Sequence, residues 1–159
     1  MHAVILAGGF GTRLAEETSV RPKPMVEIGG RPILWHIMKH LGTHGIEDFV
    51  ICLGYKGDVI KEWFADYFLR VSDVTFDLAT GRMDVLSSRA EPWRVTLLET
   101  GADTMTGGRL KQAMSHIGSD AGTILMTYGD GVADVDIGAL RKFHSEQGTL
   151  ATVTAVQPP

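Results

Sequence analysis

The feature that most constrains this sequence lies near its start, where an apolar run passes directly into a glycine-rich turn. The run Val4–Leu6 is long enough for a buried strand and too short for a helix of its own. Gly8, Gly9 and Gly11 follow at once. Glycine lets a ligand approach the main chain, and successive amide groups in such a turn form a concavity that binds anions. The sequence therefore predicts a buried strand that ends in an anion site.

Two positively charged residues, Arg13 and Lys23, follow this turn and favour a polyphosphate as the anion. A P-loop is excluded because the sequence has no Gly-Lys-Ser/Thr after four variable residues. The dinucleotide fingerprint is incomplete because Leu14 stands after Arg13, where no third glycine follows. A dehydrogenase is the weakest alternative, since no acidic residue is clearly placed after the second predicted strand to bind a ribose.

The length and the net charge of the sequence limit the classes of protein to which it can belong. A chain of 159 residues is the size of one domain and can bury a core, so we expect a single domain over residues 1–159. The net charge of −4 provides no broad basic face, which argues against nucleic acid as a partner. An anionic substrate would therefore be held by local groups and a metal ion.

The sequence also indicates the cellular compartment in which the protein is expected. No apolar stretch reaches the roughly 18 residues of a membrane span, and the N-terminus does not resemble a signal peptide. The single cysteine, Cys52, excludes an internal disulfide. These features lead us to expect a cytoplasmic protein without a membrane partner.

Strand and helix patterns alternate along the chain, which predicts an α/β fold. We expect a Rossmann-like three-layer sandwich with a mainly parallel mixed sheet and an inserted β-hairpin. The predicted strands cover residues 3–6, 49–53, 93–98, 123–127 and 149–156, and the predicted helices cover residues 31–44, 58–67, 110–117 and 137–146, the last capped by Asp136.

The predicted hairpin breaks this alternation. Residues 74–78 and 83–88 are strand-like and are joined by the turn 79–82. We interpret the hairpin as an insertion at the sheet edge that serves as a subunit contact or a lid; an ordinary β-excursion without a function is an equal alternative.

Two further segments supply candidate site residues. The polar loop 100–109 leads into a helix, and helix N-termini attract anions, so Thr104, Thr106 and Arg109 are candidate ligand contacts. Asp130 follows the strand 123–127 between two glycines, at the strand end where ligands bind in open α/β sheets. Because Mg²⁺ takes one or two protein carboxylates together with phosphate oxygens, we predict that Asp130 is a Mg²⁺ ligand.

Several strings taken together are far more specific than any one glycine pattern. They are L-A-G-G-F-G-T-R-L, R-P-K-P-M-V-E-I-G-G-R-P-I-L-W-H-I-M, L-G-Y-K-G, M-T-G-G-R-L-K and Y-G-D-G-V. In this combination, over essentially the whole chain, the sequence resembles the sugar-1-phosphate nucleotidyltransferases, and among them the enzymes that use CTP. The resemblance implies CTP and glucose 1-phosphate as substrates, CDP-glucose and pyrophosphate as products, Mg²⁺ as cofactor and a role in making surface polysaccharides.

The resemblance also implies the site residues. It places the catalytic charges on Arg13 and Lys23, and the metal ligand on Asp130. The nucleotide contacts that it implies are Leu6, Ala7, Gly8, Gly9, Phe10, Gly11, Thr12, Arg13, Lys23, Thr104, Thr106, Arg109 and Gly129. We also expect a homo-oligomer, because the hairpin and exposed aromatic side chains suggest subunit contacts.

The sequence departs from the family in length. Family members continue well past residue 159, and the continuation carries a second metal-binding aspartate and most of the sugar pocket. We therefore expect a C-terminal truncation and CTP binding that survives better than turnover. Two alternatives stay open: a related thymidylyl- or uridylyltransferase, and a nucleotide-binding module that is catalytically incomplete.

Overall fold

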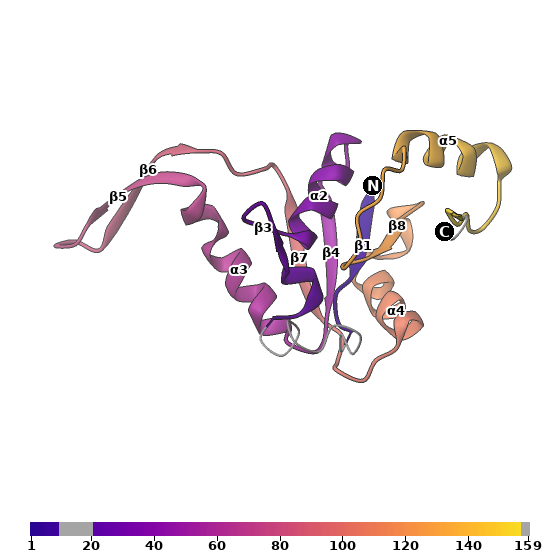
Figure 1. The fold of residues 1–159 in the computed structure, drawn as a ribbon, viewed down its shortest axis with the longest axis horizontal. Coiled ribbons are helices and arrows are strands. Elements are labelled where there is room, and N and C mark those ends of the chain that lie inside the picture. The colour runs from indigo at the N-terminus through magenta and orange to yellow at the C-terminus, as the bar shows by residue number, and fades with distance from the viewer. Residues whose placement is uncertain (10–20, 157–159) are drawn as a thin grey trace.

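The computed structural model describes residues 1–9 and 21–156 of the chain. Helices and strands alternate over most of its length, as the sequence predicts (Figure 1). The elements are β1 His2–Leu6, η1 Lys23–Met25, β2 Glu27–Ile28, β3 Arg31–Pro32, α2 Ile33–Thr43, β4 Asp48–Leu53, α3 Gly57–Arg70, β5 Ser72–Asp77, β6 Arg82–Ser88, β7 Arg94–Glu99, α4 Thr106–Ile117, η2 Ser119–Ala121, β8 Leu125–Tyr128 and α5 Ile137–Gln147.

The central sheet has four strands in the order β7-β4-β1-β8, and every pairing within it is parallel. From β1 the chain crosses to β4 and then outward to β7, and it returns to the other side of β1 for β8. This reversal makes the carboxyl ends of β1 and β8 a topological switch point, which is where open α/β sheets bind ligands. Among the described residues, antiparallel pairing occurs only in the small sheets β2-β3 and β5-β6.

Helices cover both faces of the sheet and complete the three predicted layers. One core cluster joins alternate residues of β1 and β4 to the apolar stripe of α2, with Ile5, Ile51 and Met38 almost completely buried. A smaller cluster on the opposite face packs Val4 and Val50 against α4. Because successive side chains of a strand point to opposite faces, the continuous apolar runs of β1 and β4 serve both clusters.

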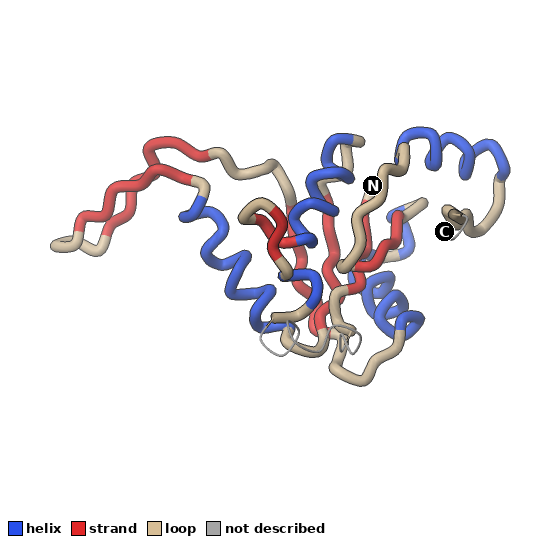
Figure 2. Tube along the Cα trace, in the orientation of Figure 1, coloured by secondary structure: helices blue, strands red, loops and turns tan. Residues whose placement is uncertain are grey.

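The β5-β6 hairpin projects away from this body (Figure 2). It follows α3 and therefore leaves from the end of the sheet opposite the carboxyl ends of β1 and β4 (Figure 1). Its side chains are mostly exposed, including the apolar residues Leu78 and Leu86. A two-stranded ribbon of this kind is marginally stable in water without something to pack against.

Three sequence predictions differ from the structure. The helix predicted over 31–44 begins only at Ile33, because Pro32 is extended and caps the helix. The helix predicted from residue 110 begins at Thr106, which places Thr106 and Arg109 inside a helix. The strand predicted over 149–156 is wrong, because this segment forms no ladder with a neighbouring strand and is drawn as loop (Figure 2).

The prediction of a helix cap at Asp136 is confirmed. Asp136 caps α5, and its side chain accepts a hydrogen bond from the Ala139 amide. Cys52 lies in β4, within the strand predicted over 49–53, and is buried. Among the residues that the structure describes, no helix has the length and apolar character needed to cross a bilayer.

Candidate functional site

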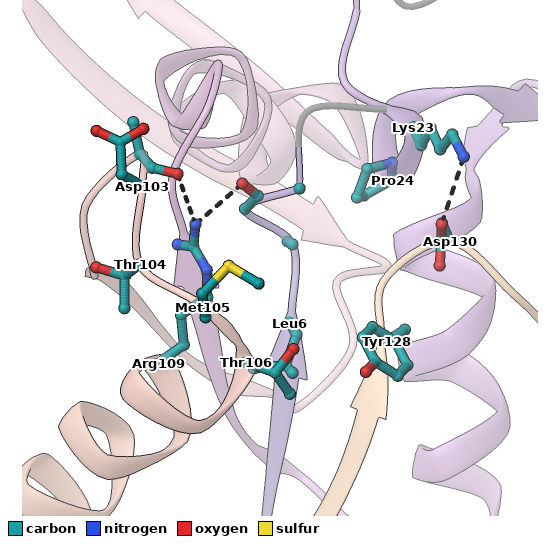
Figure 3. A pocket seen from close by; sticks show the side chains of 14 residues that line it. Leu6, Lys23, Pro24, Asp103, Thr104, Met105, Thr106, Arg109, Tyr128 and Asp130 are labelled. Atoms are coloured by element: carbon teal, nitrogen blue, oxygen red, sulfur yellow. Dashed lines mark hydrogen bonds and ion pairs between the residues drawn. The ribbon is translucent and has the colours of Figure 1, made fainter. Parts of the chain in front are cut away.

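A pocket of about 550 Å³ opens at the carboxyl ends of β1 and β8, at the switch point of the sheet (Figure 3). Ligand sites in proteins have volumes of roughly 300–1,000 Å³, so a nucleotide-sized molecule fits this space. The lining comes from the turn after β1, from η1, from the segment that leads into α4 and from the end of β8, namely Leu6, Ala7, Gly8, Gly9, Lys23, Pro24, Ala102, Asp103, Thr104, Met105, Thr106, Arg109, Tyr128 and Asp130.

The turn after β1 forms the floor of the pocket, as the sequence predicts. Leu6, Ala7 and Gly8 are buried, whereas Gly9 is exposed, and a Cβ at Gly9 would meet no atom of the described residues within 4 Å. The main chain of this turn is therefore open to a ligand at Gly9. The remaining predicted residues of the turn, Phe10, Gly11, Thr12 and Arg13, lie outside the described residues.

Lys23 reaches the pocket because η1 packs against the end of β8. Pro24 is buried, and a Cβ at Gly129 would lie 3.2 Å from its Cγ atom. The Gly129 amide donates to the Leu6 carbonyl at 3.0 Å and so extends the β1-β8 ladder by one bond. The glycine at 129 therefore lets η1 approach closely, and this contact brings the motifs around Lys23 and Asp130 together.

Lys23 and Asp130 form the polar wall of the pocket (Figure 3). The Lys23 Nζ atom lies 3.9 Å from Asp130 Oδ2, and the two side chains are 20% and 44% exposed. No group of three or more metal-ligating side chains occurs in the described ranges 1–9 and 21–156. A single carboxylate at a pocket edge fits the mode in which Mg²⁺ keeps waters and takes its other ligands from substrate phosphates.

The opposite wall is the segment between β7 and α4. Thr104 lies between two glycines: a Cβ at Gly101 would be 3.0 Å from its Oγ1, and one at Gly108 would be 2.8 Å from its Cγ2. Gly101 also has a φ of +90°, which favours glycine. Thr106 opens α4, and Thr104 and Thr106 both line the pocket. The predicted threonines are therefore brought to the same cavity as Lys23 and Asp130.

Arg109 also lines the pocket, and most of its side chain is buried. Arg109 is only 5% exposed. Its guanidinium donates hydrogen bonds to the carbonyls of Leu53, Gly8 and Ala102 and to the hydroxyl of Thr100. Two of these bonds, to the carbonyls of Gly8 and Ala102, are drawn in Figure 3. Arg109 therefore belongs to the wall of the pocket, but its outer donors are used within the protein.

Sequence reasoning missed several lining residues. Asp103 brings a second carboxylate to the pocket, and Met105 and Tyr128 supply apolar surface. Each of them adjoins a predicted residue in the sequence. The missing signal is the direction of each side chain, which local residue type does not reveal.

Comparison with known proteins agrees with this geometry. A glucose-1-phosphate cytidylyltransferase of Salmonella typhimurium is 63% identical over 159 residues, which are all of this chain and 62% of that protein. A probable glucose-1-phosphate cytidylyltransferase of Bacillus subtilis is 48% identical over 156 residues, covering 98% of this chain and 60% of the relative. The chain thus spans about three fifths of the length of these curated relatives.

A solved structure and a family profile also match this chain. The crystal structure of HddC from Yersinia pseudotuberculosis complexed with GMP-PN superposes with a TM-score of 0.64 and 27% identity, over 90% of this chain and 53% of that one. The profile described as Nucleotidyl transferase matches residues 2–159. With a parallel sheet, a switch-point pocket and a match over nearly all its length, the chain belongs to the nucleotidyl transferase family.

Proposed function

We propose that this chain binds CTP in the switch-point pocket and serves the transfer of its cytidylyl group to α-D-glucose 1-phosphate, giving CDP-glucose and pyrophosphate. The main support is the 63% identity, over every residue of the chain, to a protein named for this activity. The pocket supplies the second support, because its lining offers what an in-line phosphoryl transfer requires: open main chain, the lysine Lys23 and the carboxylate of Asp130.

This reaction requires the protein to position the two substrates and to stabilise negative charge. It does not require a covalent bond between the protein and a substrate. An oxygen of glucose 1-phosphate attacks the α-phosphorus of CTP, the new P–O bond forms, and the bond to the β-phosphate oxygen breaks to release pyrophosphate. No general base is required, because the attacking oxygen is already an anion. Catalysis then consists of alignment and stabilisation of negative charge.

Each residue has a role under this proposal. The exposed main chain at Gly9 cradles phosphate oxygens, and Lys23 stabilises the charge that develops on the α-phosphate. Arg13, which lies outside the described residues, steadies the departing pyrophosphate. Thr104 and Thr106 face the cavity from the other wall and contact the nucleotide.

The family generally uses a divalent metal ion, and we propose Mg²⁺ held by Asp130. When bound, Mg²⁺ would neutralise charge on the triphosphate. Asp130 is suited to this task because it stands just beyond the end of β8, on the pocket rim, with its carboxylate 44% exposed. In the ligand-free protein its neighbour is the Lys23 ammonium, so the charge that balances the carboxylate is present before any metal binds.

The proposal separates binding from turnover. The relatives continue for roughly two fifths of their length beyond the part that this chain matches. Because residues 1–159 already include the pocket, we propose that they form one nucleotide-binding unit, that CTP binding needs only this unit, and that turnover depends on residues of the longer relatives as well. A catalytically incomplete nucleotide-binding module is the outcome in which CTP binds and no pyrophosphate appears.

We further propose that a second copy of the chain packs on the β5-β6 hairpin, and that the protein works in the cytoplasm, where CTP is available. The hairpin exposes apolar side chains, of which Leu78 is 91% and Leu86 is 70% exposed. None of the residues lining the pocket comes from this hairpin, which favours a subunit contact over a lid. The expected absence of nucleic-acid and membrane partners remains part of the proposal.

One experiment tests the function. Protein of this sequence is incubated with glucose 1-phosphate, Mg²⁺ and CTP, dTTP, UTP or GTP, and pyrophosphate release is measured beside thermal stabilisation by each nucleotide. The proposal expects stabilisation by CTP above the others. Any pyrophosphate should come from CTP and should be released much more slowly than by a full-length relative, because turnover depends on residues of the longer relatives as well. Stabilisation by dTTP or UTP instead would establish the thymidylyl- or uridylyltransferase alternative, and no stabilisation by any nucleotide would contradict the proposed function.

A further inference from the structure

The guanidinium of Arg109 lies in the wall of the pocket, where the chain segments at the ends of β1, β4 and β7 meet. Nη1 donates to the Leu53 carbonyl at 2.7 Å and to Thr100 Oγ1 at 2.6 Å. Nη2 donates to the carbonyls of Gly8 and Ala102, both at 3.1 Å. An arginine has five N–H donors, so four of the five are used by these bonds. Their acceptors follow β1, end β4 and follow β7, so this one side chain joins the ends of three neighbouring strands of the sheet.

The position of the Arg109 side chain explains why residues 8 and 54 are glycines. A Cβ at Gly8 would collide with Nη1 and Cζ of Arg109 and would lie 2.8 Å from Nη2. A Cβ at Gly54 would lie 2.6 Å and 2.7 Å from the same two nitrogens. Neither glycine has a positive φ, so backbone conformation does not require glycine at either position. Space for the guanidinium requires glycine at position 8. At position 54 the same space and the Gly8 carbonyl oxygen, which would lie 2.8 Å from a Cβ, both require it.

The guanidinium also lacks a charged partner within the described part of the chain. No ion pair of Arg109 occurs there, and its acceptors are three carbonyls and one hydroxyl. Burying a cation costs several kcal/mol unless its hydrogen-bond donors are satisfied. The Arg109 guanidinium is therefore stable in this position only because the directions of its N–H groups match the positions of its acceptors. A fixed positive charge consequently lies directly below the turn where phosphates are expected.

We propose that Arg109 is the positioning residue of this site. Its guanidinium fixes the turns that follow β1, β4 and β7 as one rigid base, with Gly8 and Gly54 shaped to admit it, and it holds the Gly8 turn in place for a triphosphate. Cys52 supports the arrangement from below, because its thiol donates to the Arg109 carbonyl at 3.7 Å.

The first test uses thermal unfolding of the nucleotide-free protein. The variants are Arg109→Met, Arg109→Lys, Gly8→Ala and the double variant Gly8→Ala/Arg109→Met. Gly9→Ala is the matched control, because its Cβ would meet none of the residues that the structure describes. Arg109→Met and Arg109→Lys should each lower Tm by about 5 °C or more, the scale on which a domain of this size responds to losses of this kind. Gly8→Ala should lower Tm strongly in the native background and little in the Arg109→Met background, while Gly9→Ala stays near the native value.

The second test separates positioning from general loss of structure. At a temperature where Arg109→Lys is folded, its affinities for CTP and for cytidine are compared with those of the unaltered protein. Positioning through the Gly8 turn predicts weaker CTP binding, by about tenfold or more as for one lost charge-assisted hydrogen bond, and unchanged cytidine binding. A loss of structure would weaken both ligands equally.

The outcomes are distinct. A normal Tm and normal CTP affinity in Arg109→Lys would overturn the proposal, because lysine keeps the charge but cannot reach four acceptors. So would equal losses from Gly8→Ala in both backgrounds. Should Arg109→Met not fold, the comparison of Gly8→Ala with Gly9→Ala still decides. This inference depends on the proposed function only in its choice of CTP: if the unaltered protein binds no CTP, the proposed function fails, and the unfolding test still decides the inference.

Discussion

The ion pair between Lys23 and Asp130 allows a prediction in which one substitution changes two affinities in opposite directions. In the nucleotide-free protein the lysine lies 3.9 Å from the carboxylate that we propose as the metal ligand. Lys23→Met removes the cation that competes with a metal for Asp130. It also removes the group that we propose to contact the α-phosphate. Metal alone should therefore bind better, and CTP with metal should bind worse.

The structure bounds both effects. Both partners are partly exposed, so the pair contributes no more than the ~1 kcal/mol of a surface ion pair, and its removal should strengthen binding of metal alone by at most about fivefold. A charge-assisted hydrogen bond to phosphate contributes about 1.5–3 kcal/mol, so affinity for CTP with metal should fall by about 10- to 150-fold.

Two titrations measure these quantities. Free Mn²⁺, as a paramagnetic substitute for Mg²⁺, is counted by electron paramagnetic resonance in the absence of nucleotide, and CTP binding is followed by calorimetry in Mg²⁺. Lys39→Met is the matched control, because Lys39 also forms an ion pair, with Glu91 at 3.4 Å, but does not line the pocket. Unchanged CTP affinity in Lys23→Met, or weaker binding of metal alone, would refute the reasoning.

Three further predictions concern other parts of the molecule. Asp130→Asn should weaken CTP binding in Mg²⁺ and leave CTP binding in EDTA unchanged; equal loss in both buffers, measured by calorimetry, would exclude a metal role. Burial raises the pKa of the Cys52 thiol to about 11, so a thiol reagent at pH 8 should label only unfolded protein. Because the folded pKa is raised, the stability due to the neutral thiol is complete below the ordinary pKa of about 9 and is lost as the pH rises toward 11. Rapid labelling of native protein would contradict this burial. Replacing Leu78 and Leu86 of the hairpin by serine should shift the chain to monomer in sedimentation velocity without lowering its Tm, and an unaltered distribution would exclude the hairpin as the subunit contact.

Much of the fold follows from the sequence because apolar periodicity is a local signal. The buried run around Ile5, the amphipathic helix that contains Met38 and the capping residue Asp136 were all predictable from neighbouring residues. The placement of Asp130 at a strand end was equally local. These elements then meet at the switch point because parallel strands bring their carboxyl ends to one edge.

What the sequence did not reveal depends on contacts between distant segments. Gly8 and Arg109 are 101 positions apart, and only the folded structure shows that the glycine makes room for a guanidinium rather than for a ligand alone. The prediction of a strand over residues 149–156 is wrong for a related reason. The composition of this segment favours a strand, but a strand forms only where another strand pairs with it. None of the described strands pairs with residues 149–156.

The most direct test of the account is a crystal structure of the protein with CTP and Mg²⁺. We expect the triphosphate over the main chain of Gly8 and Gly9, with Lys23 on one side, a metal on Asp130 and the Arg109 guanidinium still bonded to the Gly8 carbonyl. A triphosphate bound away from this turn, or a pocket that stays empty at saturating CTP, would contradict the central claim that the switch-point pocket is a nucleotide site.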